Sequence, residues 1–298
     1  MSCFWTELVK TTQICNAGTL CAISNANNIA AISLDGLYWE EITLPAVKNW
    51  RAINFNGRFF TVITDGQNDV ITSSDGRSWA SHTMASSRAW LNLAWSGTVF
   101  CAVAYGTSVA STSPDGVAWT DRTLPSSQQW IHVAWGSDKF LTIADGSNAA
   151  ATSPDGITWT ARTLPSSGAW RVAVWNGSVF CAIRSASNAA ATSPDGITWT
   201  ARTMPSTDNW EDMVWNGSIY CAIASNSNKV AISHDGISWT EITIPVTDNW
   251  VDITWNGEIF CTVAYNSDNV AVSKDGVTWD VNTLPRNTSW TDIAAASV

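Results

Sequence analysis

The chain is written as one sequence unit that recurs every 40 residues without insertion or deletion. Each unit carries an Asp-Gly pair and two tryptophans at fixed positions. The series are Asp35, Asp75, Asp115, Asp155, Asp195, Asp235 and Asp275; Trp39, Trp79, Trp119, Trp159, Trp199, Trp239 and Trp279; and Trp50, Trp90, Trp130, Trp170, Trp210, Trp250 and Trp290. A fixed period of this length indicates a repeat architecture in which units pack on their neighbours. Seven units fill the chain, so we expect a single domain over residues 1–298.

Residues 170–203 show how one unit is expected to fold. The run WRVAVW ends at an Asn-Gly turn, and SVFCAIR, a polar SASN loop and AAATS follow. A Pro-Asp-Gly turn then leads into ITWTART. Four short β-rich runs separated by turn signals predict an antiparallel meander, and four strands per 40 residues are typical of a propeller blade. The predicted fold class is therefore an all-β, seven-bladed β-propeller with four antiparallel strands per blade.

The repeated aspartate has a structural explanation. Its carboxylate can accept hydrogen bonds from nearby backbone amides in an Asx-type turn, and the following glycine supplies a positive φ. We expect the serine two residues earlier to bond across the turn and the tryptophan to cover it. Seven structural copies are favoured over seven metal or catalytic sites.

These residues resemble the Asp-box repeat of bacterial neuraminidases, Ser-x-Asp-x-Gly-x-x-Trp. SPDGITW at residues 193–199 is one example, although the residue between Asp and Gly is missing in every unit. The shorter form, preceded by runs such as VFCAVA, is closest in style to the repeats of bacteriophage tail and virion propellers. The resemblance implies a propeller and favours a virion role.

A sialidase-type site would require an arginine triad, a Tyr–Glu pair and an acidic Asp. Arg122, Arg162 and Arg202 occupy one position in three different units and are not expected to converge. His82, His132 and His234 fall at three unrelated repeat positions, without a triad or metal-ligand spacing. We therefore predict no catalytic site, no metal and no cofactor. Cys21, Cys101, Cys181, Cys221 and Cys261 share one position, and we interpret them as small buried hydrophobic residues, with Cys3 and Cys15 as outliers.

The net charge of −10, with 15 basic and 25 acidic residues, argues against nucleic acid and against anionic membranes as partners. The first residues, MSCFWTELVK, show no charged leader before an apolar core, and no apolar run is long enough to span a bilayer. We expect synthesis in a host cytoplasm without a signal peptide, and localisation in a virion.

Comparison of the units separates scaffold from candidate site. The Asn-Gly and Asp-Gly turns barely vary, whereas the loops at the other end of the strands differ in every unit. Variable loops on a rigid scaffold are a common place for recognition. The candidate binding residues there are Tyr105, Tyr265, Arg184, Asp65 and Asp145. The alternative is that these loops are merely solvated.

Two further series were expected near the central channel. The Trp50 series begins the innermost strand, so its indoles either ring one mouth of the channel or, as we favour, pack between blades. Asp212, Asp252 and Asp292 each lie two residues after a tryptophan of this series, in three successive units. They could hold a cation, but solvated carboxylates are favoured.

The ring must be closed, because an open propeller leaves a strand edge exposed. We predict that residues 288–298 form the closing strand, and that residues 1–10 are an extension available to a partner. The combined prediction is a non-enzymatic interaction module. Its favoured role is that of a structural or host-adhesion component of a phage tail, collar or fibre. The expected partners are other virion proteins or a glycan or protein on the host surface. A carbohydrate-binding lectin and then a sialidase-class glycosidase are the alternatives.

Overall fold

In the computed structural model of the chain, residues 18–296 are described. All of the regular structure in this range is β-strand, and no helix there is long and apolar enough to cross a membrane. The strands are β1 (Leu20–Ser33), β2 (Glu40–Phe55), β3 (Phe60–Ser73), β4 (Ala80–Trp95), β5 (Phe100–Ser113), β6 (Thr120–Gly136), β7 (Lys139–Ala144), β8 (Ser147–Ser153), β9 (Thr160–Gly168), β10 (Trp170–Trp175), β11 (Phe180–Arg184), β12 (Ser187–Ser193), β13 (Thr200–Asp208), β14 (Trp210–Trp215), β15 (Tyr220–Ala224), β16 (Ser227–Ser233), β17 (Thr240–Asp248), β18 (Trp250–Trp255), β19 (Phe260–Ser273) and β20 (Asp280–Ala295).

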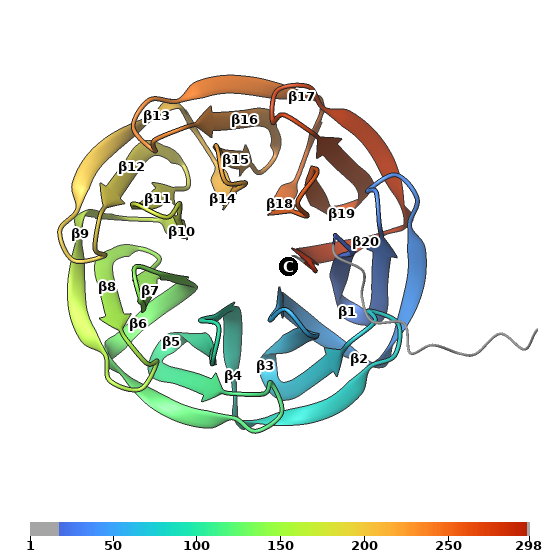
Figure 1. Ribbon diagram of the computed structural model, residues 1–298, viewed down its shortest axis with the longest axis horizontal. Helices are drawn as coiled ribbons and strands as arrows, with labels where there is room; N and C mark the ends of the chain where they lie inside the picture. The colour runs from blue at the N-terminus through green and yellow to red at the C-terminus, as the bar shows by residue number, and fades with distance from the viewer. Residues whose placement is uncertain (1–17, 297–298) are drawn as a thin grey trace, which may run out of the picture.

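The strands follow one another around a central opening in chain order, from blue to red in Figure 1. Paired strands run antiparallel, and their hydrogen bonds form one twelve-stranded sheet and two four-stranded sheets. A closed radial arrangement of antiparallel meanders is a β-propeller. The prediction of an all-β propeller is therefore confirmed.

The longest strands belong to two units at once. β2 pairs with β1 through residues 40–49 and with β3 through residues 50–55. The outer strand of one unit thus continues without interruption as the innermost strand of the next, where the sequence suggested a loop at residues 45–49. This continuity is why the twelve strands are hydrogen-bonded as one sheet.

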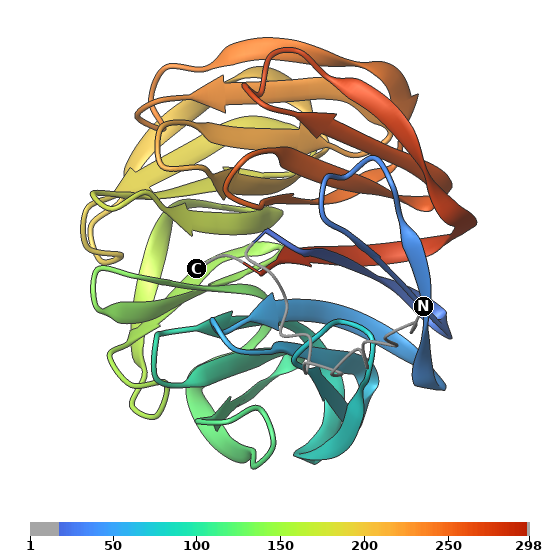
Figure 2. The same cartoon turned by 45° about the vertical axis from the view of Figure 1, so that its right-hand side comes forward.

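The two ends of the described chain meet in one sheet. β20 pairs with β19 through residues 280–289, and then with β1 from Trp290, opposite Ser24, to Ala295, opposite Leu20. Figure 2 shows the blue β1 beside the red β20. The ring of strands is closed by this pairing. The predicted extension, residues 1–10, and the last two residues of the predicted closing segment lie outside the described residues.

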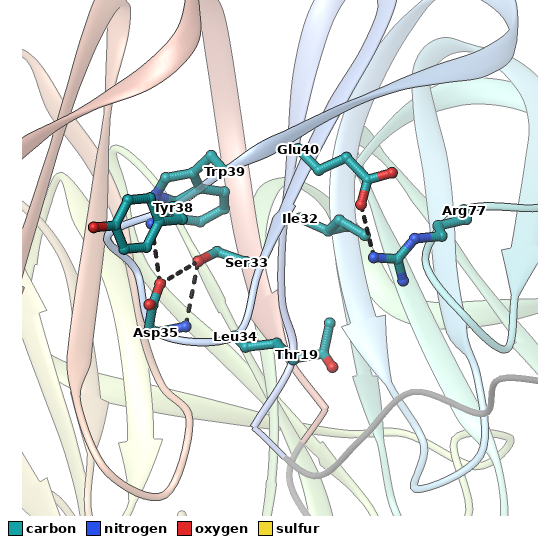
Figure 3. A pocket seen from close by; sticks show the side chains of 9 residues that line it. All are labelled: Thr19, Ile32, Ser33, Leu34, Asp35, Tyr38, Trp39, Glu40 and Arg77. Carbon is teal, nitrogen blue, oxygen red and sulfur yellow. Dashed lines mark hydrogen bonds and ion pairs between the residues drawn. The ribbon is translucent and has the colours of Figure 1, made fainter.

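The Asp-Gly turns repeat one pattern of hydrogen bonds to the aspartate. In the first unit the Oδ1 of Asp35 accepts the backbone N–H groups of Leu37 and Tyr38, at 2.9 and 3.0 Å, and the hydroxyl of Ser33. The Trp39 indole N–H donates to the Gly36 carbonyl at 3.0 Å. Figure 3 shows Asp35 and Ser33 joined in this way beside Trp39. The aspartates have the structural role that the sequence predicted.

The second tryptophan series is buried in the core. Trp50 and its six equivalents are at most 1% exposed, and the Trp50 indole N–H donates to the Ala46 carbonyl at 3.2 Å. Trp50 packs in one cluster with Ile32 of the first unit and Ile53 of the second, so the favoured alternative, packing between units, is the one observed. The five described cysteines are buried, as the sequence predicted; Cys181, for example, packs in the same cluster as Tyr220 of the next unit.

Candidate functional site

The two variable loop classes lie side by side at one end of the strands. In the first unit Asn25 is paired with Asn49, and the equivalent pairs elsewhere include Tyr105 with Gln129 and Tyr265 with Ser289. The variable residues therefore form a continuous band around that end of the propeller, which we call the loop face.

The structure places the five predicted binding residues on this face but in different units. Tyr105 is 38% exposed, whereas Tyr265, Asp65 and Asp145 are half-buried. These four share one repeat position, so they are distributed around the ring. The loop face therefore offers separate contact points, and the five residues do not build one pocket.

Arg184 is held in place by Trp170 of its own unit and by β9 of the preceding unit. Its guanidinium lies over the Trp170 ring, 5.7 Å from the centroid, and Nη1 is 3.3 Å from the Ser166 hydroxyl. A Cβ atom on Gly168 would come within 1.8 Å of the Arg184 guanidinium, so this glycine makes room for it. Arg184 is thus an ordered part of the loop face.

Asp145 joins a chain of charges that leads toward the channel. Its Oδ2 is 3.9 Å from Nη1 of Arg171, and Arg171 Nε is 3.2 Å from Oε2 of Glu211. Arg171 Nε has no hydrogen-bond partner, so the contact with Glu211 is an ion pair without hydrogen-bond alignment. The sequence analysis identified Asp145 but missed Arg171 and Glu211. Both occupy the repeat position directly after the buried tryptophan, and the residue at that position differs between units.

A channel runs through the centre of the ring in two parts. The narrow part, about 100 Å³, opens toward the loop face and is lined by Arg51, Arg171 and Glu211. The wide part, about 540 Å³, opens toward the Asn-Gly turns. Five side chains line both parts and mark the boundary between them: Asn92, His132, Asp212, Asp252 and Asp292.

The boundary carboxylates hydrogen-bond to the backbone of the next unit. Asp212 accepts the N–H of Ile253 at 3.0 Å, and Asp292 accepts that of Ile53 at 3.0 Å. Asp252 likewise accepts the N–H of Ile293, and it lies close enough to Asp212 and Asp292 for their charges to act on its carboxyl group. The expectation of freely solvated carboxylates was wrong, because these side chains are half-buried and tie adjacent inner strands together.

Burial dominates the electrostatics of this cluster. It raises the pKa of Asp212 to about 6, and it raises the pKa of Asp252 well above its usual range, where the charges of Asp292 and Asp212 add to the effect. Burial also raises the pKa of Asp292. The neighbouring His132 is kept neutral, because burial lowers its pKa to about 4.

An aromatic ring surrounds the wide part of the channel. It consists of Phe55, Trp95, Trp135, Trp175, Trp215 and Trp255, each five residues after a buried tryptophan of the second series. Sequence reasoning considered only the Trp50 series as a channel lining. The recurrence of an aromatic residue five positions later was the signal that could have revealed this ring.

The three arginines considered for a sialidase-type triad do not converge in the structure. Each of the three recurring arginines bonds within its own unit, as Arg162 does through Nε to the Thr152 hydroxyl at 3.0 Å. The His, Cys, Asp and Glu side chains in the described range form no group of three suited to a metal ion. A shallow hollow of about 350 Å³ beside Tyr38 and the Arg77–Glu40 ion pair lies at an Asp-Gly turn (Figure 3).

Comparison with known proteins supports the fold. Residues 34–169 match the family model described as the DUF6242 beta propeller domain. No curated protein matches the chain.

Three similar solved structures illustrate the range of proteins with this fold. An inactive virginiamycin B lyase from Staphylococcus aureus with quinupristin is 12% identical, with a TM-score of 0.75 over 85% of this chain and 90% of that chain. YCF48 bound to D1 peptide is 18% identical, with a TM-score of 0.62 over 82% and 85%. The nidogen/laminin complex contains a chain that is 7% identical, with a TM-score of 0.60 over 93% and 97%.

Proposed function

We propose that the chain is a non-enzymatic propeller that binds a protein partner through its loop face. The observation that carries the proposal is the arrangement of variable residues: both variable loop classes are paired into one continuous band, while the Asp-Gly turns at the other end keep one bonding pattern. Exposed Tyr105 and ordered Arg184 are side chains of the types that most often anchor interfaces.

The similar structures are consistent with a protein partner. YCF48 was solved with a D1 peptide, and another similar chain belongs to the nidogen/laminin complex. Sequence identities of 18% and 7% support the shared fold only, so the mode of binding is argued from the loop face of this chain.

The absence of catalysis is also a proposal. The arginines suited to a sialidase triad are each bonded to a threonine of their own unit, at 2.9–3.0 Å. Similarity to a lyase at 12% identity extends to the fold alone. Hydrolysis of a fluorogenic sialoside at a rate abolished by Arg162→Lys would contradict the non-enzymatic assignment.

We further propose seven four-stranded blades and a virion setting. The seven blades follow from the seven repeats. Where one long strand serves two neighbouring blades, it changes its pairing partner at the buried tryptophan, as at Trp50 in β2 and at Trp90 in β4. The virion setting, in a tail, collar or fibre, follows from the shortened Asp-box style of the repeat. Mass spectrometry of purified particles tests it, and absence of the chain from particles would refute it.

Site-specific photo-crosslinking tests the binding face. A photoreactive phenylalanine at Tyr105 or Tyr265 should crosslink one partner in the native host. The matched controls carry the same group at Val117 or Val277, which are 43% and 46% exposed at Asp-Gly turns. Equal crosslinking from both ends, or crosslinking from the control positions alone, would refute the proposal.

A further inference from the structure

The wide part of the channel is a second candidate site, separate from the loop face. It has a volume of about 540 Å³ and is walled by the inner strands of all units. Cavities of this size accommodate small organic ligands. It opens toward the Asn-Gly turns, so a ligand there would not compete with a partner on the loop face.

Its wall is aromatic. Each of the six ring residues packs against the aromatic side chain that begins the second strand, with ring centroids 4.6–4.9 Å apart and ring planes at 52–65° to one another. Trp175, for example, packs on Phe180 and remains half-buried, so part of its indole faces the cavity. Aromatic faces carry negative electrostatic potential and attract cations.

Its inner end is acidic, and Arg51 in the narrow part of the channel only partly offsets the charge there, by lowering the pKa of Asp292. Asp212, Asp252 and Asp292 come from three successive units, and no described Lys, Arg or His nitrogen lies within 4.0 Å of their carboxylates. The Oδ1 of Asn54 and the Nδ1 of His132, two further polar atoms of residues that line this cavity, are buried without a hydrogen-bond partner.

We propose that this cavity binds a small organic molecule carrying a primary ammonium group. The ammonium group has three N–H donors, which match the three carboxyl groups, and the organic body lies against the indoles. A bare metal ion is not favoured, because the described ligand-type side chains form no suitable group of three.

Binding of such a ligand is coupled to protons. A cation at the carboxyl cluster lowers the pKa values that burial has raised, so ligand binding releases protons and tightens as the pH rises through about 6. Of the other groups that face the cluster, His132 is already neutral. Arg51 and Arg171 line the narrow part of the channel, and Glu211 lies beside Arg171. Burial also raises the pKa of Glu211, so the pH dependence includes this carboxyl group as well.

Titration calorimetry with benzylammonium, at pH 5 and at pH 8, tests the proposal. We expect saturable binding that is tighter at pH 8, with heats that depend on the buffer because protons are released. Benzyl alcohol, which is neutral, and benzyltrimethylammonium, which has no N–H donor, should bind at least about tenfold more weakly.

The variants are chosen to preserve the fold. Asp252→Asn keeps an oxygen that can accept the backbone N–H, as Asn92 does for the N–H of Val133. It should weaken the binding of benzylammonium by about tenfold or more. Trp175→Leu should also weaken it, whereas Trp175→Phe, which reproduces the aromatic residue found at Phe55, should weaken it less. Asp280→Asn, an exposed outer-strand change, is the control for net charge.

Equal affinity for benzyl alcohol and benzylammonium, or no measurable heat with benzylammonium at either pH, would overturn the proposal. An effect of Asp280→Asn equal to that of Asp252→Asn would do the same. If Asp252→Asn does not fold, Asp212→Asn supplies the same comparison. None of these outcomes bears on crosslinking from the loop face, so the two proposals fail independently.

Discussion

The carboxyl cluster in the channel should lower the stability of the unliganded protein at neutral pH. Burial raises the pKa of Asp212 from the ordinary 3.8 to about 6. At about 1.4 kcal/mol per pKa unit, this difference corresponds to at most about 3 kcal/mol. Because the folded-state pKa is the higher one, the stabilisation is complete below about pH 4 and is lost as the pH rises through about 6.

Asp212→Asn should therefore stabilise the protein at pH 8 by up to about 3 kcal/mol and leave it almost unchanged at pH 4. The amide oxygen can still accept the N–H of Ile253, in the same way that Asn92 accepts the N–H of Val133 at 3.1 Å. Removing the charge also relieves Asp252, whose raised pKa is caused in part by Asp212.

The assay is denaturant unfolding, followed by circular dichroism, of both proteins at intervals between pH 4 and pH 8 and without added amines. The reasoning is refuted if the variant is equally or less stable at pH 8, or if the two stability profiles run parallel over the whole range. Asp280→Asn, exposed on the outer strand, should reproduce the wild-type profile.

Three further predictions concern the scaffold. Asp235→Ala removes the acceptor of two backbone amides at 2.8 and 2.9 Å and should cost about 1–3 kcal/mol, seen as a lower melting temperature; since those amides lower the pKa of Asp235, the cost should shrink as the pH falls. Gly168→Ala should destabilise the protein by displacing Arg184, and the double variant with Arg184→Ala should recover most of the loss in a mutant cycle, whereas additive effects would contradict the contact. Deletion of residues 288–298 removes the strand that pairs with β1 and should abolish cooperative unfolding, whereas a truncated chain that melts normally would show that the ring closes in another way.

Much of the scaffold could be predicted because its chemistry is local. The Ser–Asp–Gly–Trp turn is formed by residues within six positions of one another, so its hydrogen bonds follow from the sequence. The burial of Trp50 was also predicted as the favoured alternative, because a large ring at a repeated strand position suits the space between units.

The lining of the channel could not be predicted in the same way. Alternation along a strand tells which side chains share a face, but the inner strands contain a register shift directly after the buried tryptophan, as between Trp170 and Val172. Trp170 and Trp175 are five positions apart, so alternation alone places them on opposite faces, but it does not tell which of the two faces reaches the channel. Asp212, Asp252 and Asp292 were identified from the sequence, but their bonds to the backbone of the next unit were not, because Asp212 and Ile253 are 41 positions apart.

Closure by β20 has a consequence for synthesis on the ribosome. β1 has an unpaired edge until residues 290–295 have been made, a delay of roughly 15–50 s at ordinary rates of translation. During that time every newly made inner strand carries the same pattern as the missing one and can pair with the open edge. A strand from a neighbouring nascent chain can do so too, which would link two chains through exchanged units. Slow translation or crowded polysomes should therefore increase the yield of such linked rings at the expense of the monomer.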